Sequence, residues 1–352
     1  FIFFNKKCII IRINYNKALQ YIINPKSRVI PVFVFPNYND YDYIKVELDE
    51  QSLNYVVNNF NKINDPLTRQ ILEASLWEMV RDAKLDPRLY LGFAYKFTVY
   101  EKNALILQKI FAHIIRIIAE YISDKEFYIY SDNFNKLAWW KIKRKLSKDV
   151  KDAWFSLIIG TTSGSKDLAL PIELLNGNIT IDNFDFNQEH RWDILTRIAV
   201  VGHNKLNSLL KKEKKRDYSD IGKKASYKIE VCQLNNKEKN WNLFIKGEGY
   251  SLDYLREGMD GFFWKRQKKD LTLYIDKFFR NIENIFNSKD KNYALDFYKH
   301  LFPAMYTTKE TIEKIENLLK NKKIQPILKK ELLSSQDEIS RTIKILETYP
   351  ND

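Results

Sequence analysis

The chain has 352 residues, of which 45% are hydrophobic and 29% are charged, and it carries a formal net charge of +13. This balance is typical of a globular protein large enough for two or three domains. Only 10 glycines and 9 prolines are present, which argues against an all-β body and favours long helices.

The positive charge raises the question of an anionic partner, because nucleic acids and anionic membranes bind basic proteins. Here the lysines accompany many Asn, Ile, Tyr and Phe residues, as AT-biased coding produces without selection for a basic partner. We therefore expect no nucleic-acid partner. A basic helical scaffold for nucleic acid is kept as a third hypothesis, which predicts steeply salt-dependent binding.

Two cysteines, Cys8 and Cys232, are too few for a disulfide framework. We expect two buried free thiols, with a single bridge as the alternative. The short apolar runs before and after Lys6 and Lys7 predict no secretory signal, and no uncharged apolar run approaches the roughly 20 residues that span a bilayer. We therefore predict no transmembrane segment. Because the chain begins with Phe1, we expect a fragment, a processed product or a mis-started reading frame.

The first 49 residues fit a β-rich region. Residues 1–29 form an unassigned leader, either strands of a preceding β-domain or unrelated sequence. The β-branched and aromatic run 29–35 predicts a strand. After the turn-rich residues 36–40, alternation over 42–48 predicts a second strand. We assign residues 30–49 to the end of a small β-sandwich domain.

From residue 50 to residue 352 the pattern becomes helical, and we assign this range to one helical domain. Leu53, Val56 and Phe60 share one face of a first helix. Asp65 as N-cap and Pro66 in the first turn begin the second.

The range 101–122 is apolar almost all round, which predicts a helix covered on most sides by other helices. Its polar residues form one narrow stripe: Lys109, His113, Arg116 and Glu120. We interpret His113 as a solvated or capping histidine rather than a ligand. Ser123 and Glu126 then form a capping box that opens the next helix.

Adjacent tryptophans, Trp139 and Trp140, point to different faces of a predicted helix over 132–145, so at most one is expected to be fully buried. Core packing is our interpretation. A stacking platform for bases is the alternative, because it needs basic side chains on the same exposed face and Lys141 and Arg144 are close in sequence.

Residues 160–167 resemble a phosphate-binding P-loop only superficially. A P-loop has four residues between its glycines, with Lys directly after the second Gly and Ser or Thr after that. Three residues separate Gly160 from Gly164, Ser165 precedes the lysine and Asp167 follows it. We therefore predict an interhelical loop.

The second half continues at helical period. The predicted helices are 189–201, 270–286, 289–301, 308–320 and 326–346. The charge run 211–216 predicts a solvated surface, residues 217–220 cap a further helix, and residues 307–310 read as a capping box. In all, roughly twelve to sixteen helices are expected. The fold class is therefore mainly α, a HEAT-like superhelical stack of antiparallel helices (a bowl) after a β-sandwich remnant.

Catalytic motifs are absent from the sequence. The four histidines lie far apart: His113, His190, His203 and His300. No His-Glu-x-x-His sequence offers two imidazoles to zinc, and no Gly-x-Ser-x-Gly elbow is present. We assign no catalytic, cofactor-binding or metal-binding residue.

Three phrases, in order, resemble the C-terminal region of the aminopeptidase N-like zinc metallopeptidases, the gluzincin aminopeptidase family. The first is FPNYNDYDYIKVELD at 35–49, which is similar to the passage where that family leaves its β-sandwich. The second combines DPLTR at 65–69 with LWEMVRD at 76–82, and the third is RWDIL at 191–195. Their order and spacing make the match specific over residues 32–346. Lys329 and Lys330 stand where the family often has arginines.

The resemblance implies a larger enzyme with a zinc domain upstream of this region and a helical bowl that encloses the peptide substrate. The family's zinc-binding His-Glu-x-x-His and its Gly-x-Met-Glu-Asn substrate loop lie upstream of the matching residues 32–346. No metal or catalytic residue therefore transfers to this chain, and zinc is implied only for the complete enzyme.

Our first hypothesis is the C-terminal, substrate-enclosing portion of a zinc aminopeptidase, inactive by itself. Its expected partners are peptides and the N-terminal catalytic domain of the same enzyme. The alternative is a free-standing helical module, derived from the family, that binds peptides or proteins. The sequence does not determine the cellular compartment, although we slightly favour the cytoplasm. It also does not determine the oligomeric state or the N-terminal residue that the complete enzyme prefers.

Overall fold

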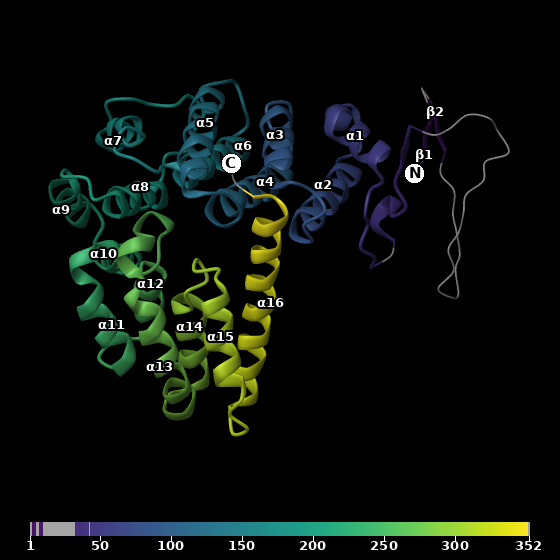
Figure 1. Cartoon of the computed structure of the whole chain (residues 1–352). Coiled ribbons are helices and arrows are strands. Elements are labelled where there is room, and N and C mark those ends of the chain that lie inside the picture. Colours follow the sequence, from purple (N-terminus) through teal and green to yellow (C-terminus); the bar gives the residue numbers. More distant parts are fainter. Residues whose placement is uncertain (1, 5–6, 10–31, 42, 351–352) are drawn as a thin grey trace. The chain divides into compact units, whose positions relative to one another are not determined.

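The computed structural model describes residues 2–4, 7–9, 32–41 and 43–350. It divides into two compact units, Phe1–Ile117 and Ile118–Asp352. The described residues form sixteen α-helices and three short strands, and Figure 1 shows how far helices dominate. The prediction of a mainly α fold of stacked helices is confirmed.

A small antiparallel sheet begins the first unit. Its strands are β1 (Ile2–Phe4), β2 (Lys7–Ile9) and β3 (Phe33–Val34), in the order β2-β1-β3. Of the strand predicted over 29–35, Phe33–Val34 is formed, and residues 29–31 lie outside the described residues. The sheet is a single layer of short strands, so the β-sandwich remnant at 30–49 stays a prediction.

The second strand predicted from alternation is wrong. Val46 and Leu48 are buried while their neighbours are exposed, so the two-residue period is present. However, residues 43–48 join no ladder among the described strands. Lys45 instead forms an ion pair with Asp82, directly after helix α2. The alternation therefore reflects an extended segment that packs on a helix.

Four helices complete the first unit. They are α1 (Glu50–Asn59), α2 (Pro66–Arg81), α3 (Pro87–Phe97) and α4 (Ala104–Arg116). The carboxylate of Asp65 accepts a hydrogen bond from the backbone N–H of Thr68 at 2.8 Å, which confirms the predicted N-cap. Asn103 caps α4 in the same way, so that helix starts later than predicted. A π-helical turn, Ile117–Tyr121, follows α4.

The second unit contains the remaining twelve helices. They are α5 (Asp124–Ile142), α6 (Lys148–Thr161), α7 (Ala169–Asn176), α8 (Gln188–Val201), α9 (Leu206–Arg216), α10 (Asp220–Cys232), α11 (Lys237–Lys246), α12 (Leu252–Asp260), α13 (Leu273–Ser288), α14 (Lys291–Leu301), α15 (Lys309–Leu319) and α16 (Pro326–Thr348). Short 3₁₀ segments at Leu234–Asn236 (η4) and Lys265–Leu271 (η5) precede α11 and α13. Helix α8 packs on α10, α10 on α12 and α12 on α14, as Figure 1 shows.

Local signals set several of these boundaries. The capping box of Ser123 and Glu126 is formed at the start of α5. The capping box predicted over 307–310 is not formed. Thr308 is the N-cap and its hydroxyl accepts from the N–H of Thr311 at 3.2 Å, while the Thr311 hydroxyl donates to the Tyr306 carbonyl at 2.8 Å. At Gly258, a Cβ atom would overlap the ring of Tyr227, which explains why α12 can approach α10 closely.

Trp139 is buried and Trp140 is 47% exposed, as their adjacency on one helix predicts. The guanidinium of Arg144 lies 4.7 Å from the centroid of the Trp140 ring, and the ammonium of Lys141 lies 5.9 Å from it. The exposed ring of Trp140 therefore makes cation–π contacts with two basic side chains near the C-terminal end of the same helix.

Candidate functional site

The side chains that the structure describes include no cluster of metal ligands. No group of three or more His, Cys, Asp or Glu residues is placed to hold a metal ion there. His190 lies 3.6 Å from Asp152, and His300 lies 3.4 Å from Asp260. Each of these two histidines therefore has a nearby carboxylate, and neither belongs to a ligand cluster.

The P-loop-like segment is filled by one of its own side chains. The carboxylate of Asp167 accepts hydrogen bonds from the backbone N–H groups of Ser163 at 2.9 Å and Gly164 at 2.8 Å. A P-loop offers such N–H groups to a phosphate. Because Asp167 already satisfies them and adds negative charge, the prediction of an interhelical loop between α6 and α7 is confirmed.

A buried polar cluster in the first unit corrects the interpretation of His113. Its Nδ1 atom lies 2.6 Å from the Glu73 carboxylate, which is 2% exposed, and its ring stacks on Trp77 with centroids 4.0 Å apart. The hydroxyl of Tyr90 donates to the same carboxylate, and burial raises the pKa of Tyr90 well above its usual value. His113 is thus neither solvated nor a cap, and it helps to hold α4 against α2.

The charge run 211–216, predicted to be a solvated surface, contains one buried residue. Glu213 is 2% exposed, although the lysines around it are exposed. Its carboxylate receives two hydrogen bonds from the Arg191 guanidinium, at 2.6 and 2.8 Å. A third nitrogen of Arg191 donates to the Leu175 carbonyl at 3.0 Å. This network joins α7, α8 and α9, and the one acidic residue within a basic run was the signal that could have found it.

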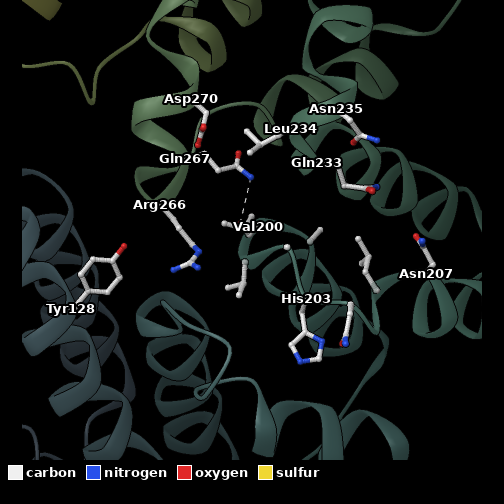
Figure 2. A pocket seen from close by; sticks show the side chains of 15 residues that line it. Tyr128, Val200, His203, Asn207, Gln233, Leu234, Asn235, Arg266, Gln267 and Asp270 are labelled. Atoms are coloured by element: carbon white, nitrogen blue, oxygen red, sulfur yellow. Dashed lines mark hydrogen bonds between the residues drawn. The ribbon is translucent and has the colours of Figure 1, made fainter.

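One cavity of about 630 Å³ lies within the second unit, and we call it the α8–α10 cavity. Its wall is built from helix ends: the end of α8 with the turn after it, the start of α9, the turn after α10, and η5 (Figure 2). Tyr128 of α5 completes the lining. Helix ends expose backbone groups that lack intrahelical partners, so such a wall is polar by construction.

Gln267 is the most deeply buried polar side chain of this wall. It is 4% exposed, and its Nε2 atom donates to the carbonyls of Cys232 at 2.8 Å and Val200 at 3.4 Å. Its Oε1 atom is buried and has no hydrogen-bond partner among the described residues. Figure 2 shows the amide beside Val200. The wall therefore contains an acceptor without a donor.

Carboxamides dominate the rest of the polar lining. They are Asn204, Asn207, Gln233 and Asn235. Two lining side chains are charged, Arg266 and Asp270, and their signs are opposite. Arg266 also donates to the Ser163 carbonyl. The cavity thus presents amide donors and acceptors with little net charge.

Behind this wall lie a buried thiol and a buried amine. Burial raises the pKa of Cys232 to about 11, and its thiol is free, as predicted; the side chain of Cys8 lies outside the described residues. Burial lowers the pKa of Lys237 to about 7. The Lys237 ammonium donates to the carbonyls of Gly261, at 3.1 Å, and Phe262. These bonds tie the start of α11 to the turn after α12.

The described residues thus define the class of the fold: a mainly helical domain with a polar cavity in its second unit. The chain belongs to the ERAP1-like C-terminal domain family, whose model matches residues 33–341. This membership confirms the resemblance found in the sequence.

One curated relative is the protein named Aminopeptidase N from Streptomyces lividans. It is 23% identical to this chain over 317 residues, which cover 89% of this chain and 37% of the relative. The chain therefore spans little more than a third of the length of that relative. In addition, no helix among residues 43–350 combines the length and apolarity needed to cross a membrane.

Proposed function

We propose that this chain is the C-terminal, substrate-enclosing portion of a zinc aminopeptidase that removes N-terminal residues from peptides. The observation that carries the proposal is the match of residues 33–341 to the ERAP1-like C-terminal domain, together with the likeness to an Aminopeptidase N. The helical domain would confine the peptide, and its expected partner is the catalytic domain of the same enzyme.

Zinc in such an enzyme activates a water molecule for attack on the peptide bond. The described residues of this chain do not fit a zinc site, because no His, Cys, Asp and Glu side chains converge on one point. We propose that the zinc lies upstream of the matching region, as the family resemblance implies, and that residues 1–352 alone are zinc-free and inactive.

The test begins with the DNA upstream of the codon for Phe1. We expect a His-Glu-x-x-His sequence there, in frame or across an intron. The chain alone and the joined protein are then compared for zinc content and for hydrolysis of an aminoacyl p-nitroanilide. We expect activity and zinc only in the joined protein, so stoichiometric zinc or turnover in the chain alone would refute the proposal.

The alternative is a free-standing helical module that binds peptides or proteins. It is favoured by one observation, that all residues lining the α8–α10 cavity belong to the second unit of this chain. A genuine start codon close to Phe1 would support this alternative over the truncated enzyme.

A further inference from the structure

We propose that helix α9 docks on an anionic lipid surface, with its lysines facing the headgroups and the two exposed apolar side chains that follow it, Tyr218 and Ile221, entering the interface. This goes beyond the function proposed above, because it concerns where the protein is held rather than what it hydrolyses. A nucleic acid and an acidic protein segment are the competing partners, and the experiment separates them from lipid.

The charge of α9 is one-sided. Five of its 11 residues are basic and one is acidic. The single carboxylate, Glu213, is buried and is bonded to Arg191 of α8. Leu206, Leu209 and Glu213 form the buried face of α9, which packs on α8 and α10 at the edge of the second unit (Figure 1). The solvent side of α9 therefore carries positive charge and no negative charge.

These cations also lack acidic partners. The exposed Lys136, for comparison, forms an ion pair with Asp132 at 2.6 Å. No described residue forms an ion pair with the four exposed lysines of α9, which are Lys211, Lys212, Lys214 and Lys215. Like charges three or four residues apart on a helix repel each other. A surface of negative charge would relieve this repulsion.

Two large apolar side chains lie exposed directly after this helix. Tyr218 is 73% exposed in the turn after α9, and Ile221 is 72% exposed in the first turn of α10. Segments that bind membrane surfaces combine basic side chains with such groups, because the cations reach the headgroups while the apolar groups enter the boundary with the acyl chains. A nucleic acid offers no apolar phase to an isoleucine. This combination therefore favours lipid over nucleic acid.

The kind of cation points the same way. Four of the five basic residues of α9 are lysines. Recognition of single phosphates or carboxylates favours arginine, whose planar guanidinium donates two parallel hydrogen bonds. A lysine acts as a point charge in the potential of a surface. Near an anionic bilayer each lysine increases affinity about fivefold, the equivalent of about 1 kcal/mol.

The test is co-sedimentation of the full chain with lipid vesicles at about 0.1 M salt. Vesicles of phosphatidylcholine with about one-third phosphatidylserine are compared with vesicles of phosphatidylcholine alone. We expect saturable binding to the anionic vesicles only. At about 1 M salt the screening length falls to about 3 Å, and binding should be largely lost.

Paired variants locate the binding surface. Lys211→Gln/Lys215→Gln should weaken binding about twenty-five-fold, at fivefold for each lysine. The control, Lys322→Gln/Lys323→Gln, removes the same charge from an exposed turn between α15 and α16 and should change binding less than about twofold. Ile221→Ser should weaken binding about threefold or more, whereas Leu333→Ser, at a position of α16 that is 47% exposed, should not. Circular dichroism checks that each variant is folded.

Three results would overturn the proposal: no binding to the anionic vesicles, equal weakening by the two lysine variants, or binding that Ile221→Ser leaves unchanged. A single-stranded oligonucleotide or a polyglutamate peptide is also added at the same concentration of negative charge as the vesicles. We expect most of the protein to stay on the vesicles. Complete release by either competitor would identify a nucleic acid or an acidic protein as the better partner, and the choice of lipid would be wrong.

Discussion

At the scale of single residues, Lys237 couples the structure to pH. Burial lowers the pKa of its ammonium from 10.5 to about 7, although its two carbonyl partners favour the charged form. Between these values the unfolded chain binds one more proton than the folded chain. The free energy of unfolding therefore rises with pH across this window.

The corresponding prediction is that stability increases from pH 7 to pH 9, by up to about 1.4 kcal/mol per pH unit. Above pH 9 the thiol of Cys232 acts in the opposite direction, because its pKa is raised from 9.0 to about 11. Urea unfolding at several pH values measures the slope. Lys237→Met should flatten it, whereas Lys239→Met, at an exposed position of the same helix, should not. A slope that survives Lys237→Met would contradict this assignment.

Glu213 gives a second prediction at this scale. Although burial opposes it, hydrogen bonds from Arg191 and Gln188 lower the pKa of Glu213 below 4.5. Its stabilising contribution is present above pH 4.5 and is lost as the pH falls through the lowered value. Glu213→Gln leaves the Arg191 charge buried and unpaired, and we expect a cost of about 3–5 kcal/mol at neutral pH with a weaker acid dependence.

The matched control is the exposed pair of Asp132 and Lys136 on α5. Asp132→Asn should cost no more than about 1 kcal/mol, because solvent screens exposed ion pairs. Equal losses of stability for both variants in denaturant titrations would contradict the prediction that the buried pair of Glu213 and Arg191 stabilises the fold more than an exposed ion pair does.

At the scale of elements, helix starts differ in how they are capped. The hydroxyl of Ser123 accepts a hydrogen bond from the N–H of Glu126 at 3.2 Å, and the Glu126 carboxylate accepts one from the N–H of Ser123 at 3.1 Å. Ser147 is the N-cap residue of α6 but makes no side-chain cap hydrogen bond. The chain thus contains one capping serine and one serine that only occupies the position.

We expect Ser123→Ala to lower the free energy of unfolding by about 1 kcal/mol. Ser147→Ala should change it by less than about 0.5 kcal/mol, since no hydrogen bond is lost. Thermal unfolding followed by circular dichroism compares the two. A larger loss at Ser147 than at Ser123 would show that the cap geometry does not control stability here.

Local sequence patterns predicted most of the helices, but they did not predict the buried polar clusters or the cavity. Spacing and caps placed α2, α8 and α15 to within a few residues, because both signals are local in sequence. Residues 132–145 were predicted as a helix of their own, but residues 132–142 are the second half of α5. The false strand over 43–48 arose because alternation records burial on one side, whatever covers it. The partner of His113 lies 40 residues away at Glu73, and no local pattern reports such a contact.

The cavity was missed for the same reason. Its polar lining comes from the ends of α8 and α10, the first turn of α9, and η5. These positions read in sequence as ordinary turns. Tertiary packing brings Gln267, in η5, to the carbonyls of Val200 in α8 and Cys232 in α10. By contrast, the family could be recognised from sequence, because its phrases keep their order along the chain.

At the scale of the molecule, the second unit has its own core. This core extends from Tyr227 to Ile339 and contains Trp241, Phe278 and Phe297. Compact units of 50–250 residues with a core of their own can fold alone. We therefore predict that a fragment of residues 118–352 folds independently.

The fragment should show helical circular dichroism and a single cooperative unfolding transition in urea. It should also retain the buried thiol of Cys232, which dithionitrobenzoate would then modify only slowly. A broad transition with immediate modification of this thiol would mean that the second unit depends on residues 1–117 for its fold.

The sealed thiol has a consequence for measuring motion. Cys232 is fully buried, and its backbone carbonyl is bonded to Gln267 on the cavity wall. In a Cys8→Ser variant it is the only thiol of the chain, and a thiol reagent can reach it only when the packing around it opens. The rate of its modification therefore measures how often the protein opens around Cys232. A ligand that keeps this region closed would lower that rate, and no label or cofactor has to be introduced to observe it.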